Sequence, residues 1–132
     1  MGEPAADRSA VDRSSASEPS QYLLLRAGDR FFAVAILEVR EVLPPQEYVR
    51  LPGAHPAVCG LVSVRSRVLT VLDLGAVLGL GRSSSSPGHR VVVLEKDGRA
   101  VGLAVSGVGE IKTGSHEYTV IHVPELLAEW FG

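Results

Sequence analysis

Short apolar runs separated by turn residues recur along the chain from Gln21 onward, and this pattern predicts a mainly β protein. The strongest local signal is Asp97-Gly98, because both central positions of a tight hairpin turn need positive φ angles. Similar turns at residues 27–30 and 65–67 join two further pairs of runs. We expect strands at residues 22–26, 31–36, 48–51, 57–64, 68–72, 91–94, 99–105 and 118–123.

Three other segments favour short helices. Residues 37–43 are dense in good helix formers and end against Pro44, and a residue before proline avoids helical backbone angles. Asp73 precedes an apolar segment and can cap its first free backbone N–H groups. Pro124 suits the first turn of a helix that continues through residues 125–130.

The first 20 residues are rich in alanine, serine and charged residues and have no periodic apolar pattern. Such a segment buries too little apolar surface to offset its conformational entropy. We therefore expect a disordered tail at residues 1–20 and a folded domain at residues 21–132, with a flexible loop at residues 81–89.

The folded part contains an internal repeat. Residues 22–42 align without a gap to residues 91–111, at an offset of 69 residues. Residues 70–78 also align without a gap to residues 119–127, but the offset is only 49, so the second copy is 20 residues shorter. The repeat predicts two similar β units, of which the second lacks about two strands and exposes an unpaired sheet edge.

The net charge and the amino-acid composition argue against several classes of function. The net charge is −2 and aromatic residues make up 5% of the chain, which gives little support to a nucleic-acid-binding face or a base-stacking platform. The single cysteine forbids an intramolecular disulfide, and neither a signal-peptide core nor a membrane-length apolar run is present. We expect a cytoplasmic protein.

Candidate catalytic and metal-binding groups are few. His55, Cys59 and Asp73 could form a nucleophilic set, but Cys59 lies in an apolar strand, where a cysteine usually acts as a small buried hydrophobe. The four histidines match no zinc spacing, and no phosphate-binding loop motif is present. We expect no enzyme activity, metal or cofactor. A small hydrolase, a nucleic-acid-binding barrel and a small β-barrel interaction module remain as alternatives.

Four stretches, in this order, carry a resemblance to a known family. They read YLLLRAGDRFFAVAILEVREVL, HPAVCGLVSVRSRVLTVLDLGAVL, VVVLEKDGRAVGLAVSGVGEI and VIHVPELL. The chain resembles the CheW family of chemotaxis adaptor (coupling) proteins. The resemblance implies two SH3-like β-barrels packed around a shared apolar seam, with intertwined subdomains at roughly residues 21–80 and 90–132 and no active site.

The resemblance also implies partners. The cytoplasmic domain of a chemoreceptor (methyl-accepting protein) would bind a groove between the barrels, and the protein would reach the membrane only through that receptor. A CheA-type histidine kinase or another CheW-like protein is a further possible partner, and nucleic acid is not. The partner-binding residues carried over by position are Ile36, Val39, Glu41 and Val108, with Gly60 and Arg65 in the family's GxxxxRG motif.

Each of these residues also has an ordinary structural interpretation. The three aliphatic side chains would be core residues, and Glu41 and Arg65 would be solvated surface charges.

The chain departs from the family at several positions. Ser66 stands where the motif has glycine, Ser106 replaces a common aspartate, and His122 stands where many relatives have Asp or Asn. Only residues 112–117 remain where relatives have a longer segment, a shortening that resembles CheW-like adaptors of accessory chemosensory systems. Because the second barrel contributes to the kinase contact in the family, we expect kinase binding to be weakened.

Overall fold

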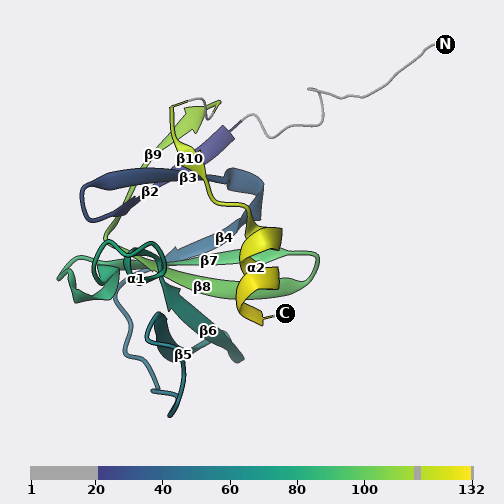
Figure 1. Ribbon diagram of the computed structural model, residues 1–132. Coiled ribbons are helices and arrows are strands. Elements are labelled where there is room, and N and C mark those ends of the chain that lie inside the picture. The colour runs from purple at the N-terminus through teal and green to yellow at the C-terminus, as the bar shows by residue number, and fades with distance from the viewer. Residues whose placement is uncertain (1–20, 115–116, 132) are drawn as a thin grey trace.

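The computed structural model describes residues 21–114 and 117–131, and it shows a mainly β protein built from two sheets (Figure 1). The predicted fold class is confirmed, whereas the predicted tail lies outside the described residues. The strands are β2 (Gln21–Ala27), β3 (Arg30–Ala35), β4 (Val39–Leu43), β5 (Val58–Val64), β6 (Arg67–Asp73), β7 (Arg90–Lys96), β8 (Arg99–Val105), β9 (Gly107–Thr113) and β10 (Thr119–Val120). The helical elements are η2 (Ile36–Glu38), α1 (Leu74–Val77), η3 (Ser83–Ser85) and α2 (Val123–Phe131).

Each sheet combines strands from both halves of the chain. One sheet has the strand order β10-β3-β2-β9, and the other has the order β4-β7-β8-β6-β5. After the β2–β3 hairpin, β4 crosses to pair with β7 of the second hairpin. After the β7–β8 hairpin, β9 crosses back to pair with β2. The two sheets are therefore held together by exchanged strands as well as by packing.

The strand register confirms the internal repeat. Val39 lies opposite Leu94, and the residues equivalent to them by the repeat, Val108 and Leu25, also lie opposite each other. Both pairings are followed by a register shift. The parallel pairing of Val71 with Gly102 likewise recurs as Val120 with Ala33.

The shortening removes one strand rather than two. The five-stranded sheet ends at β5, which pairs with β6, whereas the four-stranded sheet ends at β10, the counterpart of β6. The other strand expected in the missing interval, at residues 48–51, is only a single bridge between Val49 and Leu61. The predicted unpaired edge is confirmed among the described residues and belongs to β10.

Residues 37–43 are not a helix, contrary to the sequence prediction. Ile36–Glu38 forms one 3₁₀ turn, and the rest is strand β4, whose burial alternates along the chain. Pairing with β7 overrides the local helix propensity of leucine, glutamate and arginine, because a paired strand satisfies backbone groups that one short helical turn leaves free.

The other predicted elements are close to those observed. Asp73 caps α1 by accepting a hydrogen bond from the Ala76 N–H, and Pro124 lies in the first turn of α2. The last strand is shorter than expected, and the expected loop at residues 81–89 contains the turn η3. The longest helix among the described residues is α2, with nine residues, and none of these helices is long and apolar enough to cross a membrane.

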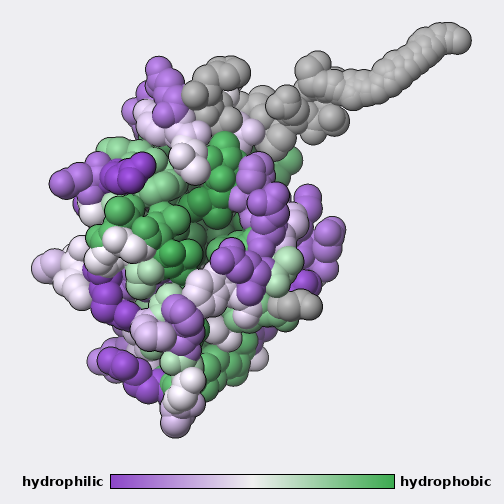
Figure 2. Space-filling model, in the orientation of Figure 1, coloured by the Kyte–Doolittle hydropathy of each residue, from purple (hydrophilic) through white to green (hydrophobic). Residues whose placement is uncertain are grey.

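The main core lies between the two sheets. It includes Leu25 and Val34 from one sheet and Leu72, Leu94 and Leu103 from the other, all fully buried, together with one face of α2. Smaller apolar clusters lie on the outer face of each sheet. Figure 2 shows hydrophobic side chains gathered between the two sheets on the viewed face, with polar side chains around them.

Candidate partner-binding surface

Ile36, Val39 and Val108 all lie at the margin of the core between the sheets. Each is half-buried and packs against that core while keeping part of its surface open. Val39 and Val108 are equivalent by the repeat and lie on β4 and β9, the two exchanged strands. Each of these side chains therefore contributes to the core with one part of its surface and can contact a partner with the rest.

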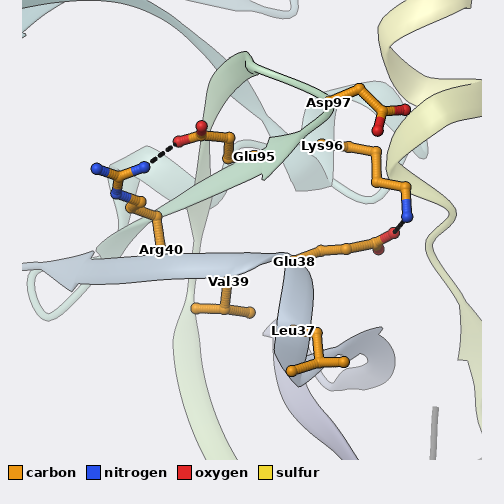
Figure 3. Close-up of a pocket in the computed structure, with 7 residues that line it drawn as sticks. All are labelled: Leu37, Glu38, Val39, Arg40, Glu95, Lys96 and Asp97. Carbon is orange, nitrogen blue, oxygen red and sulfur yellow. Dashed lines mark hydrogen bonds and ion pairs between the residues drawn. The ribbon is translucent and has the colours of Figure 1, made fainter.

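A hollow of about 410 Å³ lies beside Val39, lined by residues of η2, β4, the end of β7 and the β7–β8 turn. Leu37 lines it and is 87% exposed, which is unusual for a large aliphatic side chain. Figure 3 shows Leu37 and Val39 pointing away from a set of ion-paired side chains that lie above the strand. These pairs are Arg40 with Glu95 and Lys96 with Glu38.

Glu41 and Arg65 form a two-point ion pair. The Arg65 Nη2 and Nε atoms donate hydrogen bonds to the two Glu41 carboxylate oxygens at 2.9 and 3.3 Å. The Arg65 guanidinium thereby lowers the pKa of the Glu41 carboxyl. The pair borders a smaller hollow of about 160 Å³, which Val64 and Leu69 also line. The structure thus brings together two residues that the sequence suggested separately.

Gly60 is buried in β5, and its own backbone explains why it is glycine. Its φ of 138° is strained for any other residue, and a Cβ atom there would clash with the Val49 carbonyl oxygen. Gly60 therefore positions the Val49–Leu61 bridge, irrespective of any partner.

Sequence reasoning missed most of the charged residues around the hollow. Besides the pairs named above, Arg67 lies 3.6 Å from Glu95, so one glutamate contacts arginines of β4 and β6. The helix assignment for residues 37–43 hid this arrangement, because it does not place Arg40 beside β7. The repeat gave no signal for it, because the segment equivalent to β4, Gly107–Thr113, was not expected to be a strand either.

The suggested nucleophilic set is not assembled. The Cys59 Sγ atom lies 4.0 Å from Asp73 Oδ2, and burial, followed by the Asp73 charge, raises the pKa of the Cys59 thiol. His55 instead accepts a hydrogen bond from the Ala57 N–H and packs edge-on against Trp130. A raised thiol pKa disfavours the reactive thiolate, so Cys59 has the character of a buried apolar residue.

The described sheets and their exchanged strands can be compared with known proteins. The family model for the CheW-like domain matches residues 21–117. The chain belongs to the CheW-like family. All six candidate residues lie within the matched part of this CheW-like chain.

Several curated proteins are similar to this CheW-like chain. Chemotaxis protein CheW of Rhizobium meliloti (strain 1021) is 33% identical over 95 residues, which cover 72% of this chain and 61% of the relative. Probable chemotaxis protein CheW of Rhizobium etli is 30% identical over 109 residues, with 83% and 70% covered. Protein PilI of Pseudomonas aeruginosa is 40% identical over 83 residues, with 63% and 47% covered. The chain thus spans between about half and 70% of the length of these relatives.

A solved structure shows the same fold. The scaffolding protein TtCheW from Thermoanaerobacter tengcongensis superposes with a TM-score of 0.67 at 23% identity, over 73% of this chain and 66% of that one. The likeness extends the family assignment from sequence to architecture.

Proposed function

We propose that this protein is a non-enzymatic cytoplasmic adaptor of a chemosensory system that binds the helical cytoplasmic tip of a chemoreceptor. The observation that carries the proposal is the exposed Leu37 beside the half-buried Val39, at the margin of the core between two sheets of a CheW-like domain. The binding surface consists of Leu37 and the predicted residues Ile36, Val39, Glu41, Arg65 and Val108.

The chemistry of this surface suits an amphipathic helix. Such a helix lays its apolar face into a groove, and charged residues at the rim select its orientation. Leu37 and Val39 offer the apolar contact, and the Glu38–Lys96 pair beside the same hollow offers exchangeable charges. The Glu41–Arg65 pair borders the neighbouring smaller hollow and offers a second exchangeable pair further along β4. The hollow of about 410 Å³ beside Val39 gives one or two receptor side chains room to enter. We expect a transient interface with an apolar centre and a polar rim.

Titration calorimetry with a purified receptor cytoplasmic domain tests this surface. Leu37→Asp is the main variant, because a side chain that is 87% exposed can be replaced without unfolding the protein. We expect it, and Val39→Asp, to weaken binding at least about tenfold, since an aspartate would be buried without a partner. Val49→Asp is the matched control, because Val49 is 66% exposed on the segment that bridges to β5. Equal binding by all of these variants, or no binding by the unmodified chain, would reject the proposal.

We further propose that direct binding to a CheA-type histidine kinase is weak or absent, and that a second CheW-like protein completes the link. The support is that, among residues 21–114 and 117–131, the four-stranded sheet has no counterpart of β5. Calorimetry against the regulatory domain of the kinase tests it. Micromolar or tighter binding would mean that the missing strand is dispensable.

A nucleic-acid-binding function has no comparable support, because the net charge is −2, and Arg65 of the proposed surface and the neighbouring Arg40 are paired with glutamates.

A further inference from the structure

The four-stranded sheet carries an apolar cluster on the face turned away from the main core. Its buried members are Tyr22, Leu24, Ala33 and Ala35, with Tyr118 and Val120 packed against them. We call this set the open face. By the repeat, Tyr22 and Leu24 correspond to Val91 and Val93 of the five-stranded sheet.

The equivalent face of the five-stranded sheet is covered by its own strand β5. Cys59 and Val62 of β5 are buried in one cluster with Val91 and Val93, and Val64 packs against that cluster. No counterpart of β5 covers the open face among residues 21–114 and 117–131, and Phe31 beside it remains 43% exposed. The open face is thus the outer face of the four-stranded sheet, which a covering strand would enclose in a complete small barrel.

Two hollows in the structure occupy equivalent places. Each is lined by four residues that the repeat relates one to one to four residues of the other. The smaller hollow has Arg40, Glu41, Leu69 and Val93, and the larger one has Gly109, Glu110, Tyr118 and Leu24. The smaller also has Val64, Arg65 and Arg67 from the β5–β6 hairpin, and the two volumes are about 160 and 390 Å³. The larger hollow is therefore the space that such a hairpin strand would fill.

The charges follow the same correspondence. Glu41 is paired in two-point fashion with Arg65, which directly follows β5. Its counterpart Glu110 has a side chain that is 71% exposed and contacts Lys112 of its own strand at 3.3 Å. A strand added at the position of β5 would bring a following basic residue to Glu110.

The edge strand has backbone groups suited to such an addition. The Ile121 N–H donates a hydrogen bond to the Ala33 carbonyl, so this residue faces β3. Successive residues of a strand direct their N–H and C=O groups to opposite edges, so Val120 directs its own groups to the open side. The N–H and C=O groups of Val120 are therefore available to pair with an added strand beside the open face.

We propose that a partner protein supplies an extended segment that adds to β10 as a fifth, antiparallel strand and covers the open face. The segment carries small or β-branched apolar side chains at alternate positions, as β5 does, and an arginine directly after them that pairs with Glu110. Recognition combines backbone hydrogen bonds at Val120, apolar packing on Leu24 and Tyr118, and one charge pair. This site is separate from the surface around Leu37 and does not depend on the proposed function.

Neither the first 20 residues of this chain nor the β5 strand of a second copy supplies that segment. Residues 1–20 contain one β-branched aliphatic residue, Val11, so they lack the alternating apolar pattern. The β5 strand of a second copy is already paired with its own β6. A strand from a different protein is therefore the occupant that fits.

A synthetic peptide provides the test. The probe is residues 57–66 of this chain with Cys59→Ala, since this segment contains β5 and the following arginine. It is titrated into the full-length protein, with binding followed by calorimetry and by amide NMR shifts and hydrogen exchange. We expect saturable binding, shifts confined to β9, β10 and β2, and slower exchange of the Val120 N–H.

Three variants separate this mode from non-specific adhesion. Val120→Pro removes the edge N–H without touching the Ile121–Ala33 bond, and binding should be lost. Glu110→Arg should weaken the peptide about two- to fivefold, the range for one exposed charge pair, and a peptide with Arg65→Glu should restore the loss. Glu41→Arg, the equivalent change in the covered sheet, should leave binding unchanged.

Four results would overturn the proposal. Three concern the peptide: no saturable binding up to its solubility, shifts centred on β5 and β6, or affinity that is indifferent to Val120→Pro. The fourth is a dimer that forms with rising concentration and disappears in Val120→Pro, because the occupant would then be a second copy of this chain.

Discussion

Asp73 connects three parts of the chain through one buried carboxylate. Its side chain is fully buried and accepts hydrogen bonds from the backbone N–H groups of Ala76, Ser83 and Ser84 at 2.8–3.0 Å. The Ser84 hydroxyl donates a fourth at 2.7 Å. The sequence suggested only the first of these, the cap of α1. The other three hold the turn η3 against the end of β6.

We expect Asp73→Ala to lower the free energy of unfolding by about 3–5 kcal/mol. Losing a helix cap costs about 1 kcal/mol. Each buried donor left without an acceptor costs a further 1–3 kcal/mol or so, and two backbone donors of the η3 turn lose theirs. Water entering the new cavity offsets part of this, which places the sum at the upper end of single-substitution effects.

The pH dependence has a definite sign. Burial alone raises the pKa of the Asp73 carboxyl, but the four hydrogen bonds outweigh it and leave the pKa below its ordinary value. Because the folded state holds the proton less tightly than the unfolded state, Asp73 stabilises the fold above the unfolded pKa of about 4. That contribution disappears as the pH falls through the lower folded value. Asp73→Asn should therefore flatten the acid limb of the stability curve.

Urea unfolding followed by the fluorescence of Trp130, the single tryptophan, measures both effects. His122→Ala is the matched control, because His122 occupies the position equivalent to Asp73 before α2 but is exposed. We expect the control to change stability by less than about 0.5 kcal/mol. If Asp73→Ala costs no more than His122→Ala, or if the acid limb of Asp73→Asn matches that of the unmodified protein, the reasoning about this carboxylate is wrong.

Three further predictions concern the five-stranded sheet. Gly60→Ala should lower the free energy of urea unfolding by about 2–4 kcal/mol, because the new Cβ atom meets the Val49 carbonyl. Gly53→Ala is the control and should lower it by only about 1 kcal/mol, because φ is also positive there but nothing lies within 4 Å. Equal losses in the two variants would contradict the steric argument. Ser66→Gly should stabilise the protein by about 1 kcal/mol in the same assay, because Ser66 holds a φ of 67°, and a loss of stability would show that the serine side chain contributes more than the strain costs. Cys59 should react with a thiol reagent only as fast as the protein unfolds, since it is 4% exposed and its thiol pKa is raised by burial; rapid labelling of the folded protein at neutral pH would argue for local opening of β5.

Local chemistry made the hairpins predictable. Asp97 and Gly98 both take the positive φ angles that their residue types suggested, and the 65–67 turn likewise joins two strands. The strand β4 was missed because its evidence is not local. Val39 meets its partner Leu94 across 55 positions of sequence, and only that pairing decides strand over helix.

The positions of the candidate surface were predictable from the sequence, but their burial and pairing were not. The resemblance selected positions, and half-burial of Ile36, Val39 and Val108 is compatible with both a core and a groove, which residue type alone cannot distinguish. The Glu41–Arg65 pair required the β5–β6 hairpin to fold beside β4. Leu37 was not predicted as a partner-binding residue, because its 87% exposure depends on the 3₁₀ turn that stands in place of the expected helix.

The repeat explains how the fold is kept although the part of the chain that the structure describes has no counterpart of β5. The strand β5 covers the outer face of its sheet, whereas the main core uses the faces that the two sheets turn toward each other. Losing a covering strand therefore uncovers the outer face of the four-stranded sheet but leaves the inner faces and α2 in contact. Since Ile36, Val39 and Val108 pack at the margin of the retained core, recognition there is physically independent of what covers the open face. The two proposed sites should accordingly bind additively: saturating one with its peptide or receptor should leave the affinity of the other unchanged.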